Sequence, residues 1–255
     1  MRKYIWLALL FLINQTIIPQ SWVELNSPFN SVVRVLHISN SNTLFAGGDN
    51  GFFSTNDEGA TWDTILTAKT MSIYTQNDST WFLCTYNGIY LTLDYGENWL
   101  PFGQTIPTLQ INDMTINKND NSLFASTDLG LYKSSDNGLT WNLLLNNYGY
   151  RVVSIGDTII YLAKNGNFQK ITRSTDNGSN WTDNNLGDFS GMIYQTTEGI
   201  LFLEWHFFDT SRLYKSLNGG GSWGMIYQNQ PSISWGPVIS NTNNSLVMQR
   251  KTKHN

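Results

Sequence analysis

Cysteine, histidine and charge are scarce in this 255-residue sequence, and each scarcity argues against a class of chemistry. The only cysteine, Cys84, lies in the apolar run WFLCTY, so no disulfide forms within the chain and we expect a small buried thiol. The histidines His37, His206 and His254 are scattered and give no metal-ligand spacing. Neither a phosphate-binding loop nor a nucleophile elbow is present. We therefore expect no metal and no cofactor.

Charged residues make up only 13% of the chain, with 15 basic and 19 acidic side chains. Loss of residues 1–20 would remove Arg2 and Lys3 and leave 13 basic residues against all 19 acidic ones. Because nucleic acids and anionic lipids are bound by basic surfaces, we expect neither as a partner.

The N-terminus has the layout of a secretory signal peptide. Arg2 and Lys3 precede an apolar run, Tyr4–Ile13, and a more polar stretch follows. The run is too short to cross a bilayer. We expect cleavage near residue 20 and a product that is secreted, displayed on the cell surface or periplasmic, with no stable membrane insertion. Because no clear small-x-small cleavage site is present, a membrane anchor and a buried N-terminal strand are the alternatives.

Aromatic residues (14%) and 21 glycines are abundant, which favours many short strands and tight turns over helices. One eight-residue pattern recurs five times, and we call these segments the repeat hairpins. They are TNDEGATW (55–62), TLDYGENW (92–99), SSDNGLTW (134–141), STDNGSNW (174–181) and SLNGGGSW (216–223). Their tryptophans are 37, 42, 40 and 42 residues apart. A period near 40 residues is typical of a four-stranded blade of a β-propeller.

Each repeat hairpin follows a similar order of predicted elements. In the first copy, two strands (32–38 and 43–48) precede the turn 49–51, and a short third strand (52–53) leads into the hairpin. The dipeptides Asn87-Gly88 and Asn165-Gly166 mark the same turn in later copies, since both residue types tolerate positive φ. Every segment is too short for a helix. The sequence therefore predicts an all-β fold of four-stranded antiparallel blades.

The repeat hairpins match the pattern S/T-x-D-x-G-x-S/T-W, known as the Asp box or bacterial neuraminidase repeat. From about Trp22 to its end, the chain resembles the Asp-box β-propeller superfamily. That superfamily includes sialidases, xyloglucan-cleaving glycosidases, sortilin ectodomains and a photosystem II assembly factor family. The resemblance implies a β-propeller with five recognisable blades and a partial sixth. It does not select a function, because these proteins share the scaffold.

We expect structural roles for the repeated residues. The acidic side chain can accept hydrogen bonds from turn N–H groups, the glycine supplies a permissive backbone, and the tryptophan packs under the hairpin. The carboxylates are therefore predicted to build peripheral turns, not to act as catalytic acids or calcium ligands. Asn218 replaces Asp in the fifth copy, where its amide oxygen can still accept. The residues concerned are Asp57, Gly59, Trp62, Asp94, Gly96, Trp99, Asp136, Gly138, Trp141, Asp176, Gly178, Trp181, Asn218 and Trp223.

The two ends of the chain complicate the blade number. After the signal peptide (1–20), the propeller is expected over residues 21–255, with the segment at Trp22 pairing in the last blade as an outer strand. Two strand-like runs, Ser232–Ile239 and Ser245–Gln249, fit the inner strands of an incomplete sixth blade. The alternative is a piece of a longer propeller. We favour the second interpretation, because a blade without its third strand exposes an edge.

No catalytic set stands out. Resemblance to sialidases would imply three clustered arginines with a tyrosine–glutamate pair and an aspartic acid. The usual R-I-P tripeptide is absent; Arg34 and Arg151 lie on expected inner strands, whereas Arg173 and Arg212 precede repeat hairpins. Carboxylates expected on inner strands or their turns show no paired spacing; they are Asp49, Asp113, Asp128 and Glu204. Arginines are also too few for the arginine-rich patch associated with the photosystem assembly family.

The fifth repeat departs from the others in LFLEWHFFDTSRLYKS (201–216), where aromatic residues surround Glu204 and His206. Its turn belongs to the face opposite the repeat hairpins, and aromatics beside a carboxylate suit a sugar or peptide. Two ordinary strands joined at Asp209-Thr210 are the alternative. The candidate ligand-face residues are Arg34, Asp128, Glu204, Trp205 and His206. The sequence favours an exported, non-catalytic propeller that binds a protein or carbohydrate; a sialidase-like hydrolase and a photosystem assembly-type propeller are the alternatives.

Overall fold

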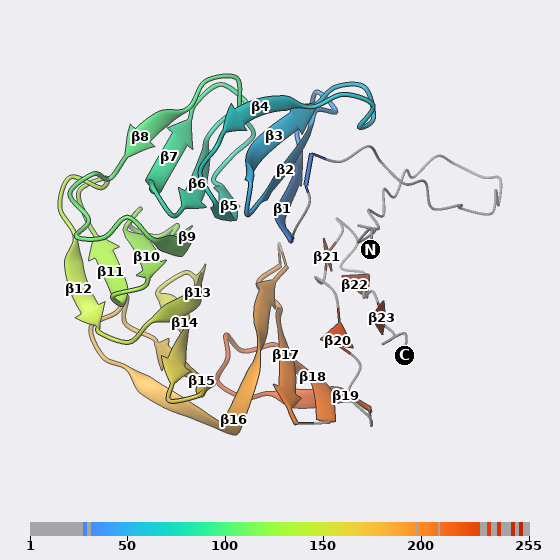
Figure 1. Ribbon diagram of the computed structural model, residues 1–255. Helices are drawn as coiled ribbons and strands as arrows, with labels where there is room; N and C mark the ends of the chain where they lie inside the picture. The colour runs from blue at the N-terminus through green and yellow to red at the C-terminus, as the bar shows by residue number, and fades with distance from the viewer. Residues whose placement is uncertain are drawn as a thin grey trace. The chain divides into compact units, whose positions relative to one another are not determined.

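The computed structural model describes residues 28–29, 32–196, 198–208 and 210–229, together with four two-residue strands between 234 and 251. Every regular element among these residues is a β-strand, as the sequence predicts (Figure 1). No helix in the described part is long and apolar enough to cross a membrane. The expected signal peptide and the expected strand at Trp22 lie outside the described residues. The chain divides into two compact units, Met1–Pro101 and Phe102–Asn255.

The first unit carries two four-stranded antiparallel sheets, each with its strands in chain order. A tight turn joins the second and third strands of each sheet, and a repeat hairpin joins the third and fourth. The first sheet comprises β1 (Val33–Ile38), β2 (Leu44–Gly48), β3 (Gly51–Thr55) and β4 (Asp63–Leu66). The second comprises β5 (Thr70–Thr75), β6 (Trp81–Thr85), β7 (Gly88–Thr92) and β8 (Leu100–Phe102), which ends at the boundary between the units.

The second unit carries a third four-stranded sheet and a seven-stranded one. The long strand β16 accounts for the larger sheet, because its first half pairs with β15 and its second half, from Ser190, pairs with β17. Two predicted blades are thus joined by one continuous strand. The smaller sheet comprises β9 (Ile111–Ile116), β10 (Leu123–Thr127), β11 (Leu131–Ser134) and β12 (Asn142–Leu145). The larger comprises β13 (Gly149–Ile155), β14 (Thr158–Asn165), β15 (Phe168–Ser174), β16 (Thr182–Gln195), β17 (Leu201–Phe207), β18 (Thr210–Ser216) and β19 (Gly224–Asn229).

The described strands beyond β19 form two short antiparallel ladders. These pair β20 (Ser234–Trp235) with β23 (Arg250–Lys251) and β21 (Ile239–Ser240) with β22 (Leu246–Val247). Strand β20 lies within the expected run Ser232–Ile239, and β22 lies within the expected run Ser245–Gln249. Their place in an incomplete sixth blade stays a prediction.

Within each unit, the sheets pack face to face around their second strands. Strands β2, β6 and β10 are buried at every residue, so they lack the alternation of a half-exposed strand. In the first unit, Phe45 of β2 packs with Trp81 and Leu83 of β6. In the second, Phe124 of β10 packs with Tyr161 of β14. Within each unit, neighbouring blades therefore pack against each other through these buried faces.

The repeat hairpins are built by a fixed set of local hydrogen bonds. In the third copy, Ser134 Oγ donates to Asp136 Oδ1 (2.8 Å) and accepts from the Gly138 N–H (2.8 Å). Thr140 donates its N–H to Asp136 Oδ1 (2.9 Å) and its hydroxyl to Oδ2 (2.6 Å). The first, second and fourth copies repeat this set with the equivalent side chains. In the fifth copy Asn218 Oδ1 accepts the Ser216 hydroxyl (3.0 Å) and the Ser222 N–H (2.9 Å), but the last bond is reversed, since Asn218 Nδ2 donates to the Ser222 hydroxyl (2.9 Å).

Hydrogen bonds to the hairpin carboxylates favour their charged form. They lower the pKa of Asp57 to about 2, chiefly through the Thr61 hydroxyl, and that of Asp176 to about 2, chiefly through the Asn180 N–H. The same contacts lower the pKa values of Asp94 and Asp136. These carboxylates are engaged in building turns.

The hairpin glycine is required for two reasons. Gly96 has a φ of +89°, and a Cβ there would lie 2.6 Å from Trp81 and 2.8 Å from Phe45. Gly178 has a φ of +87°, and its Cβ would lie 3.2 Å from Phe124 of the preceding blade. The glycine therefore allows the left-handed turn and also lets the hairpin backbone approach the preceding blade closely.

The hairpin tryptophans are half-buried, and Trp99 and Trp181 also hold the turn by hydrogen bonds. The indole N–H of Trp99 donates to the Gly96 carbonyl, and that of Trp181 donates to the Gly178 carbonyl, both at 3.0 Å. The motif alone did not indicate these hydrogen bonds.

Candidate functional site

In each antiparallel blade, the turn between the second and third strands lies at the end opposite the repeat hairpin. The connection that enters the first strand of the next blade lies at that same end. We call this end of each unit its turn face. Loops held by a rigid scaffold commonly carry binding residues. The polar and aromatic side chains on the turn faces are therefore the candidates for function.

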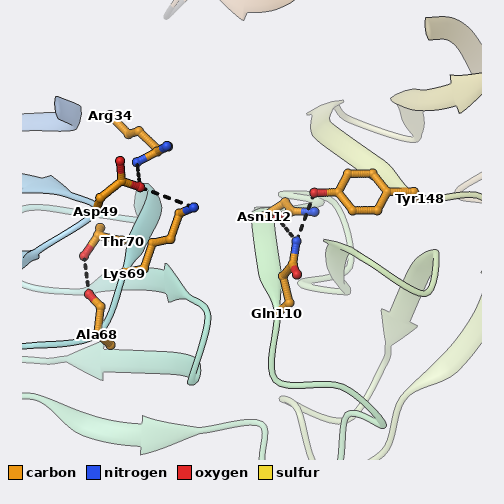
Figure 2. A network of polar contacts seen from close by, with 8 residues as sticks. All are labelled: Arg34, Asp49, Ala68, Lys69, Thr70, Gln110, Asn112 and Tyr148. Atoms are coloured by element: carbon orange, nitrogen blue, oxygen red, sulfur yellow. Dashed lines mark hydrogen bonds and ion pairs between the residues drawn. The ribbon is translucent and has the colours of Figure 1, made fainter. Parts of the chain in front are cut away.

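Two cations converge on one carboxylate at the turn face of the first unit (Figure 2). Arg34 in β1 places Nη1 2.6 Å from Asp49 Oδ1, and Lys69, just before β5, places Nζ 3.2 Å from the same oxygen. The hydrogen bond from Arg34 is the main cause that lowers the pKa of Asp49. Lys69 also lies 4.4 Å from the ring centroid of Tyr86, a cation–π contact. Arg34, Lys69 and Asp49 together carry a net charge of +1, and all three side chains are partly exposed, so a ligand can reach this charge.

An uncharged group lies at the turn face of the second unit, and we call Gln110, Asn112, Tyr148 and Tyr150 the amide–tyrosine cluster; Figure 2 shows the first three of these residues. Gln110 Nε2 donates to Asn112 Oδ1 (3.2 Å) and to Tyr148 Oη (2.9 Å). Asn112 Nδ2 donates to the carbonyl of Gly149 (2.7 Å). The rings of Tyr148 and Tyr150 lie 5.1 Å apart. Within the described residues, Gln110 Oε1 accepts no hydrogen bond, so this oxygen is available to a ligand.

The candidate carboxylates of the second unit are engaged by neighbouring groups. Asp113 is buried in β9 and accepts the Val152 N–H of β13 at 3.1 Å, while Arg151 Nε lies 3.7 Å away. Asp128 accepts the Thr108 hydroxyl at 2.5 Å. Asp113 therefore links the inner strands of two adjacent blades, and Asp128 fixes the loop that precedes β9.

A chain of hydrogen bonds crosses the fifth blade, from Tyr194 to Ser211. Tyr194 Oη donates to Glu204 Oε2 (3.3 Å), and Glu204 Oε1 lies 2.9 Å from His206 Nε2. His206 Nδ1 lies 2.8 Å from the Ser211 hydroxyl, directly across the ladder. Glu204 is 5% exposed and Ser211 is fully buried. The order serine–histidine–carboxylate is that of a hydrolase triad, but this buried hydroxyl has no access to a substrate.

Trp205 lies on the other face of β17 from Glu204 and His206, because side chains alternate along a strand. It is 5% exposed and packs with Val153 and Leu203 in the core between the fourth and fifth blades. The Arg212 guanidinium lies 4.5 Å from its ring. The three consecutive candidates of the fifth repeat therefore do not form one surface.

Aromatic rings continue from Trp205 to the tip of the β17–β18 turn. Phe207 lies 5.4 Å from Phe168 and 4.5 Å from Phe208, measured between ring centroids. Phe208 is 82% exposed and has a φ of +47°, which is uncommon for a bulky residue. An exposed ring held in this conformation adds an apolar contact point to the turn face.

Of the predicted ligand-face residues, Arg34 lies against Asp49, and Glu204 lies against His206. Arg173, which was predicted only to precede a repeat hairpin, donates its Nε–H to the Gly219 carbonyl of the fifth hairpin (2.7 Å). Sequence reasoning missed Lys69, Gln110 and Tyr148. A usable signal was present: all three lie in the short connections that lead into the first strand of a blade.

No protein-family model matches the chain, and no curated protein matches its sequence. Solved structures resemble its fold at low sequence identity. The extracellular domain of BT4673 from B. thetaiotaomicron matches with a TM-score of 0.65 and 15% identity over 89% of this chain and 31% of that one. YCF48 bound to D1 peptide matches with a TM-score of 0.59 and 16% identity over 88% of this chain and 77% of that one.

A Niastella koreensis GH74 enzyme matches with a TM-score of 0.56 and 16% identity, over 76% of this chain and 38% of the enzyme. The chain thus spans about a third of the length of the GH74 and BT4673 structures. Identities this low show the architecture alone. The chain has the β-propeller fold, in four-stranded antiparallel blades similar to those of these proteins.

Proposed function

We propose that this chain is an exported, non-catalytic binding module that holds an extended segment of a protein ligand on the turn face of its second unit. The observation that carries the proposal is the amide–tyrosine cluster. Extended peptide backbone offers N–H donors and carbonyl acceptors in alternation. Gln110 Oε1 provides an acceptor beside the Tyr148 hydroxyl and the Tyr148–Tyr150 ring pair.

The residue types of the cluster suit protein recognition. Tyrosine supplies a large, rigid contact area at low conformational cost, and neighbouring amides supply adaptable hydrogen bonds. Gln110 and Tyr148 are half-buried, so part of their conformational freedom is already lost before a ligand arrives. The exposed ring of Phe208 gives the same unit an apolar anchor.

The state of the carboxylates supports binding over hydrolysis. Glycoside cleavage by two carboxyl groups needs both to face one cleft, one as acid and one as base or nucleophile. Asp113 accepts a backbone N–H, Asp128 accepts a hydroxyl and Glu204 is buried beside His206. Each is committed to a contact within the protein.

Two further points support an exported protein-binding role. One structure with this fold is YCF48 bound to D1 peptide, and another is the extracellular domain of BT4673. The N-terminal sequence has the layout of a secretory signal. The structural matches support the proposal through the fold, and the N-terminal sequence supports export.

The test begins with residues 21–255 and a phage-displayed library of random 12-residue peptides. The affinity of a selected peptide should be lower by about tenfold or more for the Tyr148→Ala and Gln110→Ala variants than for the unchanged chain, since a central tyrosine often contributes more than 1.4 kcal/mol. Leu139→Ser is the matched control, because Leu139 is 71% exposed on the third repeat hairpin. Thermal melts of each variant separate lost binding from lost folding.

Three results would contradict the proposal. The first is selection of no peptide above background. The second is a peptide whose affinity falls with Leu139→Ser but not with Tyr148→Ala. The third is turnover of a sialoside or a β-glucan oligosaccharide by the purified chain. If the chain bound such oligosaccharides without cleaving them, and bound no peptide, its ligand would be a glycan and not a protein.

A further inference from the structure

The two units carry the same carboxylate in the same turn. Asp49 directly follows β2 and Asp128 directly follows β10, the second strands of the first and third blades. Each stands two residues before a glycine of positive φ, which is +142° at Gly51 and +147° at Gly130. Asp128 therefore occupies in the third blade the position that Asp49 occupies in the first.

The residues around the two carboxylates are equivalent as well. Strand β1 pairs with β2 as β9 pairs with β10, and each first strand has a one-residue bulge at the end nearest this turn. The bulged residue is Arg34 in β1 and Asn112 in β9. Lys69 and Tyr148 correspond too, since each directly precedes the first strand of the next blade and accepts, at its carbonyl, an N–H from that blade.

The two carboxylates differ in their partners. Asp49 Oδ1 receives two cations, with Arg34 Nη1 at 2.6 Å and Lys69 Nζ at 3.2 Å (Figure 2). The third blade has the neutral residues Asn112 and Tyr148 at those two positions. Within the part of the chain that the structure describes, Asp128 forms no ion pair, and only its Oδ1 accepts a hydrogen bond, from the Thr108 hydroxyl. Asp128 therefore lacks the cations that its counterpart has.

The unused groups beside Asp128 are acceptors. The Asp128 N–H donates to the Gln110 carbonyl (3.4 Å), which brings these two residues together. Asp128 Oδ2 and Gln110 Oε1 accept no hydrogen bond from the described residues. Of the basic side chains in β13 and β14, Arg151 lies beside Asp113 and Lys164 is exposed. Because a half-buried carboxylate gains most from a charged donor, a ligand that fits these acceptors is a cation.

We propose that the protein segment held by the amide–tyrosine cluster presents an arginine side chain to Asp128 and Gln110. The inference rests on the proposed function and names the side chain that the site selects. A guanidinium offers five N–H donors in one plane, enough for both free oxygens, and its flat face stacks on aromatic rings such as those of Tyr148 and Tyr150. The ligand thus supplies to Asp128 the charge that Arg34 supplies to Asp49.

The first test compares two phage-displayed libraries of 12-residue peptides on residues 21–255, one complete and one without arginine and lysine. Only the complete library should yield binders, and these should contain arginine. Equal yields from both libraries, with binders that Tyr148→Ala weakens, would overturn the arginine and leave the proposed function standing. Binders that carry lysine and no arginine would overturn it too. No binders from either library would contradict the proposed function itself.

A double-mutant cycle then tests the contact between Asp128 and the arginine of a selected peptide. Asp128→Asn removes the charge and keeps an oxygen for the Thr108 hydroxyl. It should weaken the arginine peptide about tenfold, the effect of one lost charge-assisted contact, and hardly change the affinity of the same peptide with citrulline, which is neutral. Replacing the peptide's arginine by lysine should cost an intermediate amount.

Glu198→Gln is the matched control, because it also removes a carboxylate from the second unit. Glu198 is exposed between β16 and β17, at the end of the blade opposite the turn face. This variant should bind the arginine peptide as the unchanged chain does, and thermal melts of both variants check folding. If Asp128→Asn weakens the arginine and citrulline peptides equally, the guanidinium does not contact Asp128 and the proposal is wrong.

Discussion

Replacement of a hairpin glycine by alanine separates backbone strain from close packing. Gly96 has a φ of +89°, where a residue with a Cβ loses about 1–2 kcal/mol. Its Cβ would also lie 2.6 Å from Trp81 and 2.8 Å from Phe45, two buried rings with little room to move. Overpacking of a core usually costs about 1–3 kcal/mol. The free energy of unfolding should therefore fall by about 2–5 kcal/mol in Gly96→Ala.

Gly88 is the matched control in the same blade. Its φ is +106°, comparably unfavourable for alanine, and a Cβ there would meet no atom within 4 Å. Gly88→Ala should lose only the backbone part, about 1–2 kcal/mol. Urea denaturation followed by tryptophan fluorescence measures both variants. Equal losses in the two would show that close approach of the hairpin backbone to the Trp81 and Phe45 rings does not stabilise the fold.

Three further predictions concern the hydrogen bonds described above. The pKa of Asp57 is about 2 in the folded protein, against an ordinary value of 3.8, so its contribution to stability is complete above pH 3.8 and is lost as the pH falls towards 2. Urea midpoints measured between pH 2 and 5 should show this decline. A flat profile would contradict the prediction. Asp113→Ala leaves the buried Val152 N–H unpaired and should cost about 1–3 kcal/mol in urea denaturation, while Asp113→Asn should recover part of it. His206→Phe should lower the melting temperature more than Tyr194→Phe, because His206 bonds both Glu204 and Ser211; the reverse order would argue against the chain of contacts.

The fold was predictable because its signal is repeated. Five hairpins at a period near 40 residues fix the strand order in each blade, and the glycine and acidic positions follow from turn geometry. The continuous strand β16 was not predictable, since the polar run Asp183–Gly187 has the composition of a loop. The structure carries the strand through it because Asn184 Nδ2 donates to the Gly220 carbonyl (2.6 Å) and Gly187, with a φ of +74°, absorbs a bulge.

The candidate site was less predictable, because its contacts join residues far apart in the sequence. Neighbours in sequence suggested one surface from Glu204, Trp205 and His206, but strand alternation separates Trp205 from the other two. Which face of this strand is buried depends on the adjacent blade, and the local sequence pattern does not indicate which face that is. Gln110 and Tyr148 are 38 residues apart and meet only because each precedes the first strand of successive blades.

The two ends of a blade differ in how far their polar groups are satisfied, and this difference locates function. At the hairpin end, both oxygens of Asp136 accept bonds from within eight residues of chain, so substitutions there should alter stability. At the turn face, Gln110 Oε1 accepts no bond from the described residues, and only Nη1 of the Arg34 guanidinium contacts Asp49. Half-exposed groups with unused donors and acceptors gain more from a ligand than saturated ones do. Changes in binding and changes in stability should therefore segregate to opposite ends of the same blades.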